Sequence, residues 1–340
     1  MRAAVYTRYG SPEVVSLAEV PIPVPKSHEV LVRVYVSTVN RTDCGFRSAQ
    51  YFISRLFSGL FKPRNKILGC EFSGVVEAVG GNVTNFKVGS RVFGYDDGCF
   101  GGHAEYKVIG EDKALALIPD GLDFAVGAAL TEGSHYALFI IRAAKVKKGD
   151  TVLVYGSTGA IGSAAVQLLK HFGAFVVAVS NTKNTGLVKS LGADEVIDYQ
   201  TQDFTQTVHR FDFIFDAVGK SSFRQCKPLM KDKGIYISTE LGKHSENIWL
   251  ALITPFWGGR KVLFPLPLIK KEDVLYLRDL AQQGSFRPVI DRSYNLDNIV
   301  EAYHYVETGQ KTGNVILNIL ECTSTETSVK RKRKKPRRIL

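Results

Sequence analysis

The chain has 340 residues, of which 45% are hydrophobic and 23% are charged, as is ordinary for a soluble globular protein. That length allows two domains and a large buried core. The formal net charge of +11 is misleading, because eight of the nine residues from Lys330 to Arg338 are basic. Without those eight, 36 basic residues face 33 acidic ones, so the body of the chain lacks the charge pattern of a nucleic-acid-binding surface.

No run of about 18 apolar residues suggests a membrane span, and the N-terminal residues lack the apolar core of a signal peptide. The five cysteines are odd in number and widely scattered, which favours a reducing compartment over a disulfide framework. We therefore expect a cytoplasmic protein. From Glu321 on we expect a disordered tail, whose basic run 330–338 weakly matches a nuclear import signal and could attract an anionic partner.

Residues 1 to about 122 contain short segments rich in β-forming residues, separated by turns. Ala3–Thr7 predicts a strand. Along 29–36 one face consists of valines and the other of Leu31, Arg33 and Tyr35, which predicts a half-buried strand. The apolar stripe of Tyr51–Phe61 is more typical of a lid or core element over a substrate cleft than of a membrane-surface helix.

A glycine-rich turn follows an apolar run that starts at Thr151 and ends at Tyr155. A helix is then expected from Ser163 to His171. Three glycines spaced in this way allow a tight turn and let the backbone approach a pyrophosphate at the helix N-terminus. The turn therefore predicts a dinucleotide site made of Gly156, Ser157, Thr158, Gly159, Ala160, Ile161 and Gly162.

The next predicted strand, Phe175–Val179, ends at the position that distinguishes NAD(H) from NADP(H). An NAD site usually places Asp or Glu there to accept the ribose 2′-hydroxyl, and the segment 180–183 holds no carboxylate. Ser180 and Lys183 could instead bind a 2′-phosphate, so the sequence favours NADP(H) over NAD(H). The alternative is that Lys183 is an ordinary solvated loop lysine.

Strands and helices alternate through residues 123–260, which predicts an α/β fold with a doubly wound parallel sheet. Mixed segments return in 261–320. The further predicted elements are strands at Glu195–Tyr199, Phe211–Asp216, Gly234–Ser238 and Asn314–Asn318 and a helix at Leu275–Gly284.

Several motifs in order along residues 1–318 resemble those of the medium-chain dehydrogenase/reductases, in their zinc-independent, quinone oxidoreductase-like branch. The motifs are Val39–Arg47 with its Asn-x-x-Asp-x-x-x-Arg pattern, Ile67–Val76, Gly89–Gly94, Gly101–Tyr106, Ala128–Thr131, Asp216–Gly219 and Gly313–Leu317. The resemblance implies a GroES-like, β-rich catalytic domain built from 1–122 and 261–320. A Rossmann dinucleotide-binding domain, 123–260, is inserted between these parts, with substrate in the interdomain cleft. The family commonly forms homodimers.

The same resemblance assigns further cofactor contacts. Thr131 lies on the amide side of the nicotinamide, Val218 lines the cofactor, and Thr239 and Leu241 border the nicotinamide. Tyr199 packs near the adenosine. Each of these roles is an expectation carried over from the family.

Zinc-dependent relatives begin the segment at Asn40 with a Cys ligand and have a His ligand where this chain has Cys70. Both ligands are therefore replaced, and no two cysteines here lie three apart as in a structural zinc lobe. We expect no zinc, and chemistry carried by hydride transfer from the cofactor. Cys70 itself fits a small buried residue on a strand.

The candidate catalytic residues are Asn40, Tyr51 and Asp43, as donors of a proton or hydrogen bond to the substrate oxygen. Tyr51 fits equally well as an aromatic anchor under a loop, and Asp43 with Arg47 as a structural ion pair. The predicted activity is NADPH-dependent reduction of quinones or α,β-unsaturated carbonyl compounds. The alternatives are a zinc-free alcohol dehydrogenase, a 2-enoyl reductase, or a nucleotide-fold scaffold that binds nucleic acid or anionic surfaces through its tail.

Overall fold

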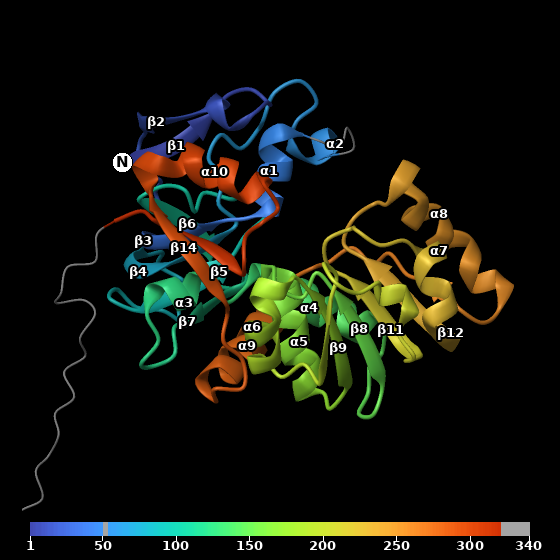
Figure 1. Ribbon diagram of the computed structural model, residues 1–340. Coiled ribbons are helices and arrows are strands. Elements are labelled where there is room, and N and C mark those ends of the chain that lie inside the picture. The colour runs from blue at the N-terminus through green and yellow to red at the C-terminus, as the bar shows by residue number, and fades with distance from the viewer. Residues whose placement is uncertain (50–53, 321–340) are drawn as a thin grey trace, which may run out of the picture.

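The computed structural model describes residues 1–49 and 54–320, and Figure 1 shows two large sheets with helices around them. The strands are β1 Arg2–Tyr6, β2 Val15–Glu19, β3 Glu29–Val39, β4 Glu71–Val79, β5 Arg91–Tyr95, β6 Tyr106–Gly110, β7 Leu115–Leu117, β8 Thr151–Tyr155, β9 Phe175–Ser180, β10 Glu195–Asp198, β11 Phe211–Asp216, β12 Met230–Ser238, β13 Lys261–Val262, β14 Ile290–Asn295 and β15 Asn314–Asn318. The helices are α1 Arg41–Ser48, α2 Ser54–Ser58, α3 Phe124–Ala128, α4 Glu132–Ala143, α5 Ala160–His171, α6 Thr185–Ser190, α7 Phe223–Cys226, α8 Glu246–Ile253, α9 Lys271–Gln282 and α10 Ile299–Glu307. The first two strands, β1 and β2, form a separate two-stranded antiparallel sheet.

The first sheet is built from both ends of the chain. Its strand order is β14-β15-β3-β4-β5-β7, and β6 adds to β3. The pairs are antiparallel except for β14 with β15, and β15 places Ile316 opposite Thr38 on β3. In Figure 1 the red C-terminal strand β14 accordingly lies among the blue and teal strands of the N-terminal third.

Strand β3 is buried on both faces, so the prediction of a half-buried strand is wrong. Leu31 and Tyr35, on the face that was expected to be open, are 7% and 2% exposed. Helix α3 packs against this face, and the ring of Tyr35 stacks on Phe124 with 5.0 Å between ring centroids. A local alternation pattern could not reveal this cover, because α3 lies more than 80 residues further along the chain.

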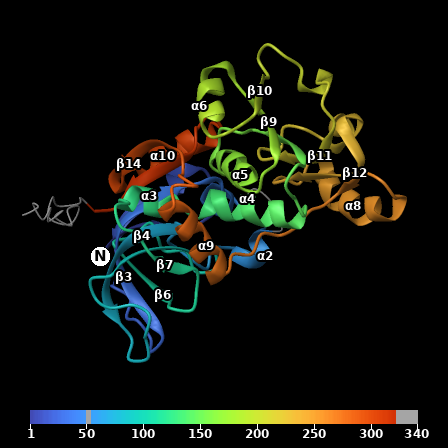
Figure 2. The ribbon, with the colours of Figure 1, turned by 90° about the horizontal axis from the view of Figure 1, so that it is seen from below.

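The second sheet has six parallel strands in the order β10-β9-β8-β11-β12-β13. The order reverses between β8 and β11, so the sheet is doubly wound as predicted, with its switch point at the carboxyl ends of these two strands. Helices α4 and α5 pack on one face, and α7 and α8 pack on the other (Figures 1 and 2). Ligands bind at such switch points because the loops from the two sides diverge there.

The predicted elements are confirmed with modest shifts in their ends. β11 and β15 have the predicted bounds, whereas β12 begins four residues early, at Met230. α5 begins at Ala160 and not at Ser163, because the first turn of the helix forms directly from the glycine turn. The third glycine, Gly162, is therefore a helical residue.

Helix α9 joins the two sheets, since it contacts both β7 of the first sheet and α4 on the second (Figure 2). The edge strand β13 pairs with β12, so the parallel sheet runs on to Val262. The domain boundaries at 122 and 260 stay a prediction.

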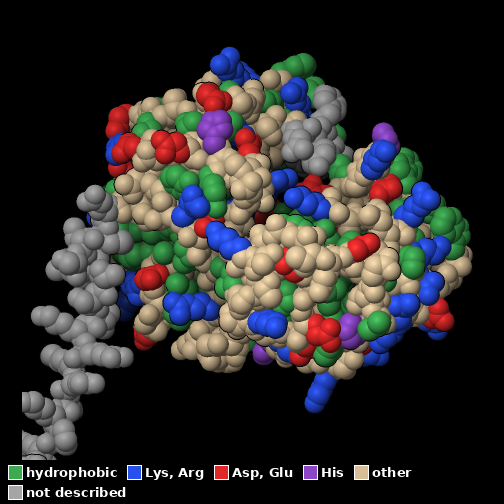
Figure 3. Space-filling model, in the orientation of Figure 1, with side chains coloured by type: hydrophobic (Ala, Val, Ile, Leu, Met, Phe, Trp, Pro, Cys, Tyr) green, Lys and Arg blue, Asp and Glu red, His purple; other side chains and the backbone are tan. Residues whose placement is uncertain are grey.

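One helical stretch of the described residues, Phe124–Ala143, is long and apolar enough by length and composition to cross a membrane, but 83% of its apolar window is buried inside the protein. Packing between the two sheets accounts for this apolar composition. On the face shown in Figure 3, basic and acidic side chains interleave, as expected from the near balance of charges outside the tail. The basic run 330–338 lies outside the described residues.

Candidate functional site

The glycine turn after β8 is shaped by two close backbone approaches. Gly156 has φ of 78°, and a Cβ there would lie 2.6 Å from both methyl groups of Val218. A Cβ at Gly162 would lie 2.1 Å from the carbonyl oxygen of Gly156, so only glycine lets the helix start this close to the strand. Ser157 is fully buried, and its hydroxyl donates to Val179 O at 2.8 Å, which ties the turn to β9.

The N-terminus of α5 is open toward the predicted pyrophosphate position. Gly159 is its N-cap and supplies no side-chain cap for the first-turn N–H groups. The turn is held from outside by Gly313, whose N–H donates to Thr158 O at 2.7 Å. Uncapped helix N–H groups next to a glycine turn fit a dinucleotide pyrophosphate.

Three predicted cofactor residues meet at the carboxyl ends of β9 and β10. Tyr199 donates its N–H to Ser180 O at 3.0 Å and is 52% exposed, as a side chain available to stack on a ligand should be. Ser180 is 2% exposed and its hydroxyl donates to Asn181 O, whereas Lys183 is exposed and makes no side-chain hydrogen bond or ion pair with a described residue. The sequence analysis missed Asp198, which lies opposite Ser180 in the β-ladder and accepts the hydroxyl of Thr182.

The other cofactor candidates follow β11 and β12. The buried Asp216 carboxylate accepts the N–H groups of Val218 and Gly219 at 3.1 and 2.8 Å, which fixes the turn that faces Gly156. Thr239 donates its N–H to Asp216 O at 3.0 Å, and Thr239 and Leu241 are partly exposed beyond the end of β12. These side chains therefore share the switch-point edge with the glycine turn.

Asn40 begins α1 with a reciprocal cap. Its Oδ1 accepts the Asp43 N–H at 2.9 Å, while Asp43 Oδ2 accepts the Asn40 N–H at 3.3 Å. Asn40 Nδ2 donates to the Cys70 thiol at 3.0 Å and to Thr38 Oγ1 at 3.4 Å. Asn40 is 2% exposed, so all its polar atoms are used in holding α1 to the ends of β3 and β4.

Asp43 is too deeply buried to act as an acid that faces the substrate. It is fully buried and accepts Gly69 N–H at 3.0 Å, and burial raises the pKa of its carboxyl to about 7. His103 Nε2 lies 3.8 Å from Asp43 Oδ2, but burial lowers the pKa of this imidazole to about 4, so it is neutral near pH 7. The expected ion pair of Asp43 with Arg47 is wrong, because Arg47 pairs with Glu307.

A second buried carboxylate, Glu71, joins the two sheets. Its Oε1 accepts the N–H and hydroxyl of Thr131 at 3.1 and 2.8 Å and the N–H of Glu132, and its Oε2 accepts the hydroxyl of Thr38 at 2.6 Å. Thr131 is fully buried by these contacts. The contacts anchor the start of α4 to β3 and β4.

Glu132, the first residue of α4, was missed by the sequence analysis. It is 3% exposed, and its Oε1 accepts the Thr42 hydroxyl at 3.1 Å. A Cβ at the next residue, Gly133, would lie 2.6 Å from the backbone carbonyl of Ala160, so the starts of α4 and α5 are in direct contact. The available signal was an acid directly after the Ala128–Thr131 motif.

Tyr51, the third catalytic candidate, lies outside the described residues. Burial raises the pKa of a different phenol, that of Tyr136 on α4, and the Thr42 hydroxyl acts in the opposite direction. Thr42 therefore lies near two groups on α4, Glu132 and Tyr136.

The residues around Asn40 do not fit a zinc centre. Among residues 1–49 and 54–320, no group of three or more His, Cys, Asp or Glu side chains could hold a metal ion. Burial raises the pKa of the Cys70 thiol well above its ordinary value, so the thiolate that zinc requires is disfavoured.

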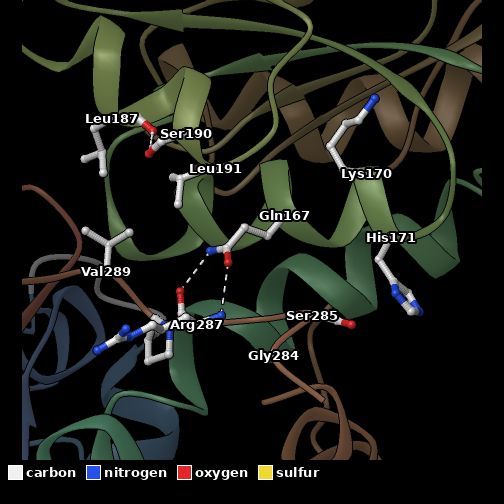
Figure 4. Close-up of a pocket in the computed structure, with 11 residues that line it drawn as sticks. Gln167, Lys170, His171, Leu187, Ser190, Leu191, Gly284, Ser285, Arg287 and Val289 are labelled. Atoms are coloured by element: carbon white, nitrogen blue, oxygen red, sulfur yellow. Dashed lines mark hydrogen bonds between the residues drawn. The ribbon is translucent and has the colours of Figure 1, made fainter. Parts of the chain in front are cut away.

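Two cavities bear on where a ligand could bind. One of about 340 Å³ is lined by Tyr6, Phe46, Ser58, Asn65, Asp97, Gly98 and Phe100. The other, of about 620 Å³, lies between the C-terminal half of α5, α6 and the segment after α9 (Figure 4). In the larger one Gln167 exchanges two hydrogen bonds with the Arg287 backbone, at 3.0 Å each, drawn dashed in Figure 4. Only the smaller cavity adjoins α1.

Comparisons with known proteins give consistent results. Residues 26–120 match the family described as alcohol dehydrogenase GroES-like domain, and residues 191–317 match the family described as zinc-binding dehydrogenase. The chain is 33% identical over 330 residues to a 2-methylene-furan-3-one reductase of Solanum lycopersicum, covering 94% of this chain and 79% of that protein.

Identity is 30% over 330 residues to a chloroplastic NADPH-dependent alkenal/one oxidoreductase of Arabidopsis thaliana, covering 93% of this chain and 79% of that protein. The solved structure of a quinone oxidoreductase from Coxiella burnetii is similar with a TM-score of 0.84 and 26% identity, covering 94% of this chain and 99% of that one.

Proposed function

The chain belongs to the medium-chain dehydrogenase/reductase family, quinone oxidoreductase-like, and on this premise we propose that it is an NADPH-dependent, zinc-independent reductase. Its acceptors would be quinones or α,β-unsaturated carbonyl compounds. Reduced nicotinamide supplies the hydride in such a reaction, and the protein binds, orients and polarises the two reactants.

One observation carries the proposal: the starts of three helices meet at the switch-point edge of the parallel sheet. The start of α5 at Ala160 touches the start of α4 at Gly133, and Glu132 beside it is bonded to Thr42 on α1. A dinucleotide on the glycine turn would thus extend toward α1, and the cavity lined by Phe46 lies on that helix. The N-terminus of α5, which has no side-chain cap, and the close backbone contacts at Gly156 and Gly162 support cofactor binding in this arrangement.

The preference for NADP(H) rests on Lys183, an exposed cation with no partner among the described side chains, close to Ser180. Asp198 is a carboxylate at this edge, and its hydrogen bond with the Thr182 hydroxyl occupies one of its oxygens. The relative from Arabidopsis thaliana named for NADPH supports the same choice.

The acceptor class rests on the aromatic lining of the smaller cavity. Phe46 and Phe100 meet there edge to face, with 4.9 Å between ring centroids, and Tyr6 completes an apolar wall that suits a flat conjugated acceptor. The relatives named for furanone, alkenal/one and quinone reduction fit this class. We propose that Asn40 and Asp43 act by fixing α1, while Tyr51, the homodimer and the cytoplasmic location stay predictions.

The proposal of zinc independence rests on the side chains that stand at the ligand positions. Asn40 and Cys70 bond to one another where a zinc relative places two ligands, and the carboxylates of Glu71 and Asp43 accept backbone N–H groups. A panel of acceptors tests the whole proposal: purified protein, NADPH, and in turn phenanthrenequinone, a conjugated enone and a simple aldehyde. The expected result is rapid loss of NADPH absorbance with the first two. Tight NADPH binding without turnover of any acceptor would refute it.

A further inference from the structure

Glu132 is a buried carboxyl group that has no part in binding or orienting the reactants as proposed above. It lies at the contact between α4, α5 and α1, with 3% of its surface exposed. Among the described residues, its side chain has one hydrogen bond, from the hydroxyl of Thr42 at 3.1 Å. A carboxyl group in such a place is costly as a carboxylate, so its protonation state matters.

The charged and titratable groups that face Glu132 come from every element packed against it. Glu71 and Cys70 approach from the start of β4, Asp43 from α1, Tyr95 from β5, Tyr136 from α4 itself and Lys311 from the segment before β15. Burial is the largest cause that raises the pKa of Glu132, and the Glu71 carboxylate is the second; Lys311 acts in the opposite direction.

Hydrogen bonding decides which of the two neighbouring carboxyl groups holds a proton. Glu71 accepts four donors, two of them backbone N–H groups, and such bonds favour its ionised form. From the described residues, the Glu132 side chain accepts only the Thr42 hydroxyl. The pair therefore holds its proton on Glu132 near neutral pH.

Thr42 connects Glu132 to the helix that borders the smaller cavity. It is partly exposed, and it shares a face of α1 with Phe46, four residues further on, which lines the smaller cavity. A hydroxyl group can accept a proton from one partner while it donates its own to another. Asp97, another lining residue, raises the pKa of Tyr136, which lies four residues after Glu132 on α4.

We propose that Glu132 supplies, through the Thr42 hydroxyl, the proton that completes reduction of the acceptor. This inference rests on the proposed reductase function. Reduced nicotinamide gives the acceptor a hydride, which consists of one proton and two electrons. In the free protein the Thr42 hydroxyl donates to Glu132 Oε1; when the acceptor binds, the hydroxyl turns its proton to the acceptor oxygen, and the protonated carboxyl group of Glu132 donates to Thr42 Oγ. As the acceptor oxygen gains the Thr42 proton, Thr42 Oγ gains the proton of Glu132, which becomes a carboxylate and is reprotonated by solvent before the next turnover. Thr42 is then the catalytic proton donor, and Glu132 is the residue that replaces the proton that Thr42 gives up.

The test combines Glu132→Gln, Thr42→Val and Thr42→Ser, with Glu111→Gln as a matched control at a carboxylate remote from the site. We expect Thr42→Val and Glu132→Gln to lower kcat by about 100-fold, within the usual range for a general acid, with the Km for NADPH unchanged. Thr42→Ser should retain most of the activity. Wild-type kcat should fall as the pH rises through the raised pKa of Glu132, and this limb should vanish in Glu132→Gln.

A second readout needs no turnover. Infrared spectroscopy of the cofactor-free protein at neutral pH should show the carbonyl stretch of protonated carboxylic acids. The Glu132 component of this band should be present in wild type and Glu111→Gln and missing in Glu132→Gln, in which the contribution of Asp43 remains. Absence of a band that depends on Glu132 would overturn the proposal whether or not the protein is a reductase. If the Glu132→Gln variant were active with a wild-type pH profile, the proposed proton relay would be overturned, but the reductase function would stand.

Discussion

The side-chain amide of Asn40 donates to the thiol of Cys70 over 3.0 Å, and this bond joins the two positions at which zinc-dependent relatives hold their metal. Both partners are buried, at 2% and 0% exposure. The bond connects the start of α1 to the start of β4, and we propose that it takes the place of a metal there.

Metal removal should leave the protein unchanged. Purified protein should contain far less than one equivalent of zinc by elemental mass spectrometry, and a chelator should alter neither its melting temperature nor its NADPH oxidation. The physical reason is that Asn40 is a poor zinc ligand and the Cys70 thiol is held neutral by burial. One equivalent of zinc per chain, with activity lost to the chelator, would contradict the argument.

Replacement of Gly162 by alanine should damage both stability and cofactor binding. The new methyl group would lie 2.1 Å from the Gly156 carbonyl oxygen, which cannot move without opening the turn, so we expect a loss of about 1–3 kcal/mol in the free energy of unfolding. Gly186→Ala is the matched control, because nothing lies within 4 Å of its Cβ position on α6. That control should be neutral or more stable by up to about 1 kcal/mol. Thermal unfolding with and without NADPH separates the two effects, and equal behaviour of the two variants would count against the geometry.

Lys183→Ala should weaken NADPH selectively. Loss of a charged hydrogen bond to the 2′-phosphate predicts a rise of about tenfold or more in the Kd for NADPH, with little change for NADH. The control is Lys189→Ala, another exposed lysine on the neighbouring helix α6. Calorimetry with both cofactors gives the comparison. A parallel loss for NADPH and NADH, or the same loss in Lys189→Ala, would remove Lys183 from the cofactor site.

His103 and Asp43 should oppose each other in the pH dependence of stability. The folded pKa of His103 is lowered to about 4, so its contribution to stability is lost as the pH falls from about 6.5 toward 4. The folded pKa of Asp43 is raised to about 7, so the folded state binds an extra proton and gains stability as the pH falls from 7 toward 4. The two groups therefore change the free energy of unfolding in opposite directions over nearly the same pH range.

His103→Gln should therefore gain stability relative to wild type as the pH is lowered from 6.5 to 4, by at most about 1.4 kcal/mol per pH unit. Denaturant unfolding at several pH values measures the difference, in which the Asp43 slope is common to both proteins. Parallel pH curves for the two proteins would show that His103 is not held neutral by the fold.

Local patterns predicted the parts of the molecule that local forces determine. The glycine turn, β11 and β15 follow from sequence because strand and turn preferences act over a few residues. The wrong predictions concern distant partners: Arg47 pairs with Glu307, 260 residues away, and α3 covers the second face of β3. Glu132 was missed for the same reason, since its neighbours Thr42 and Glu71 are distant along the chain.

The most direct test of the proposed function is the initial rate of NADPH oxidation by metal-stripped protein with phenanthrenequinone, measured beside NADH. We expect turnover equal to that of untreated protein and a clear preference in kcat/Km for NADPH. Turnover that appears only after zinc is restored, or a preference for NADH, would contradict the proposal that this chain is a zinc-independent, NADPH-dependent reductase.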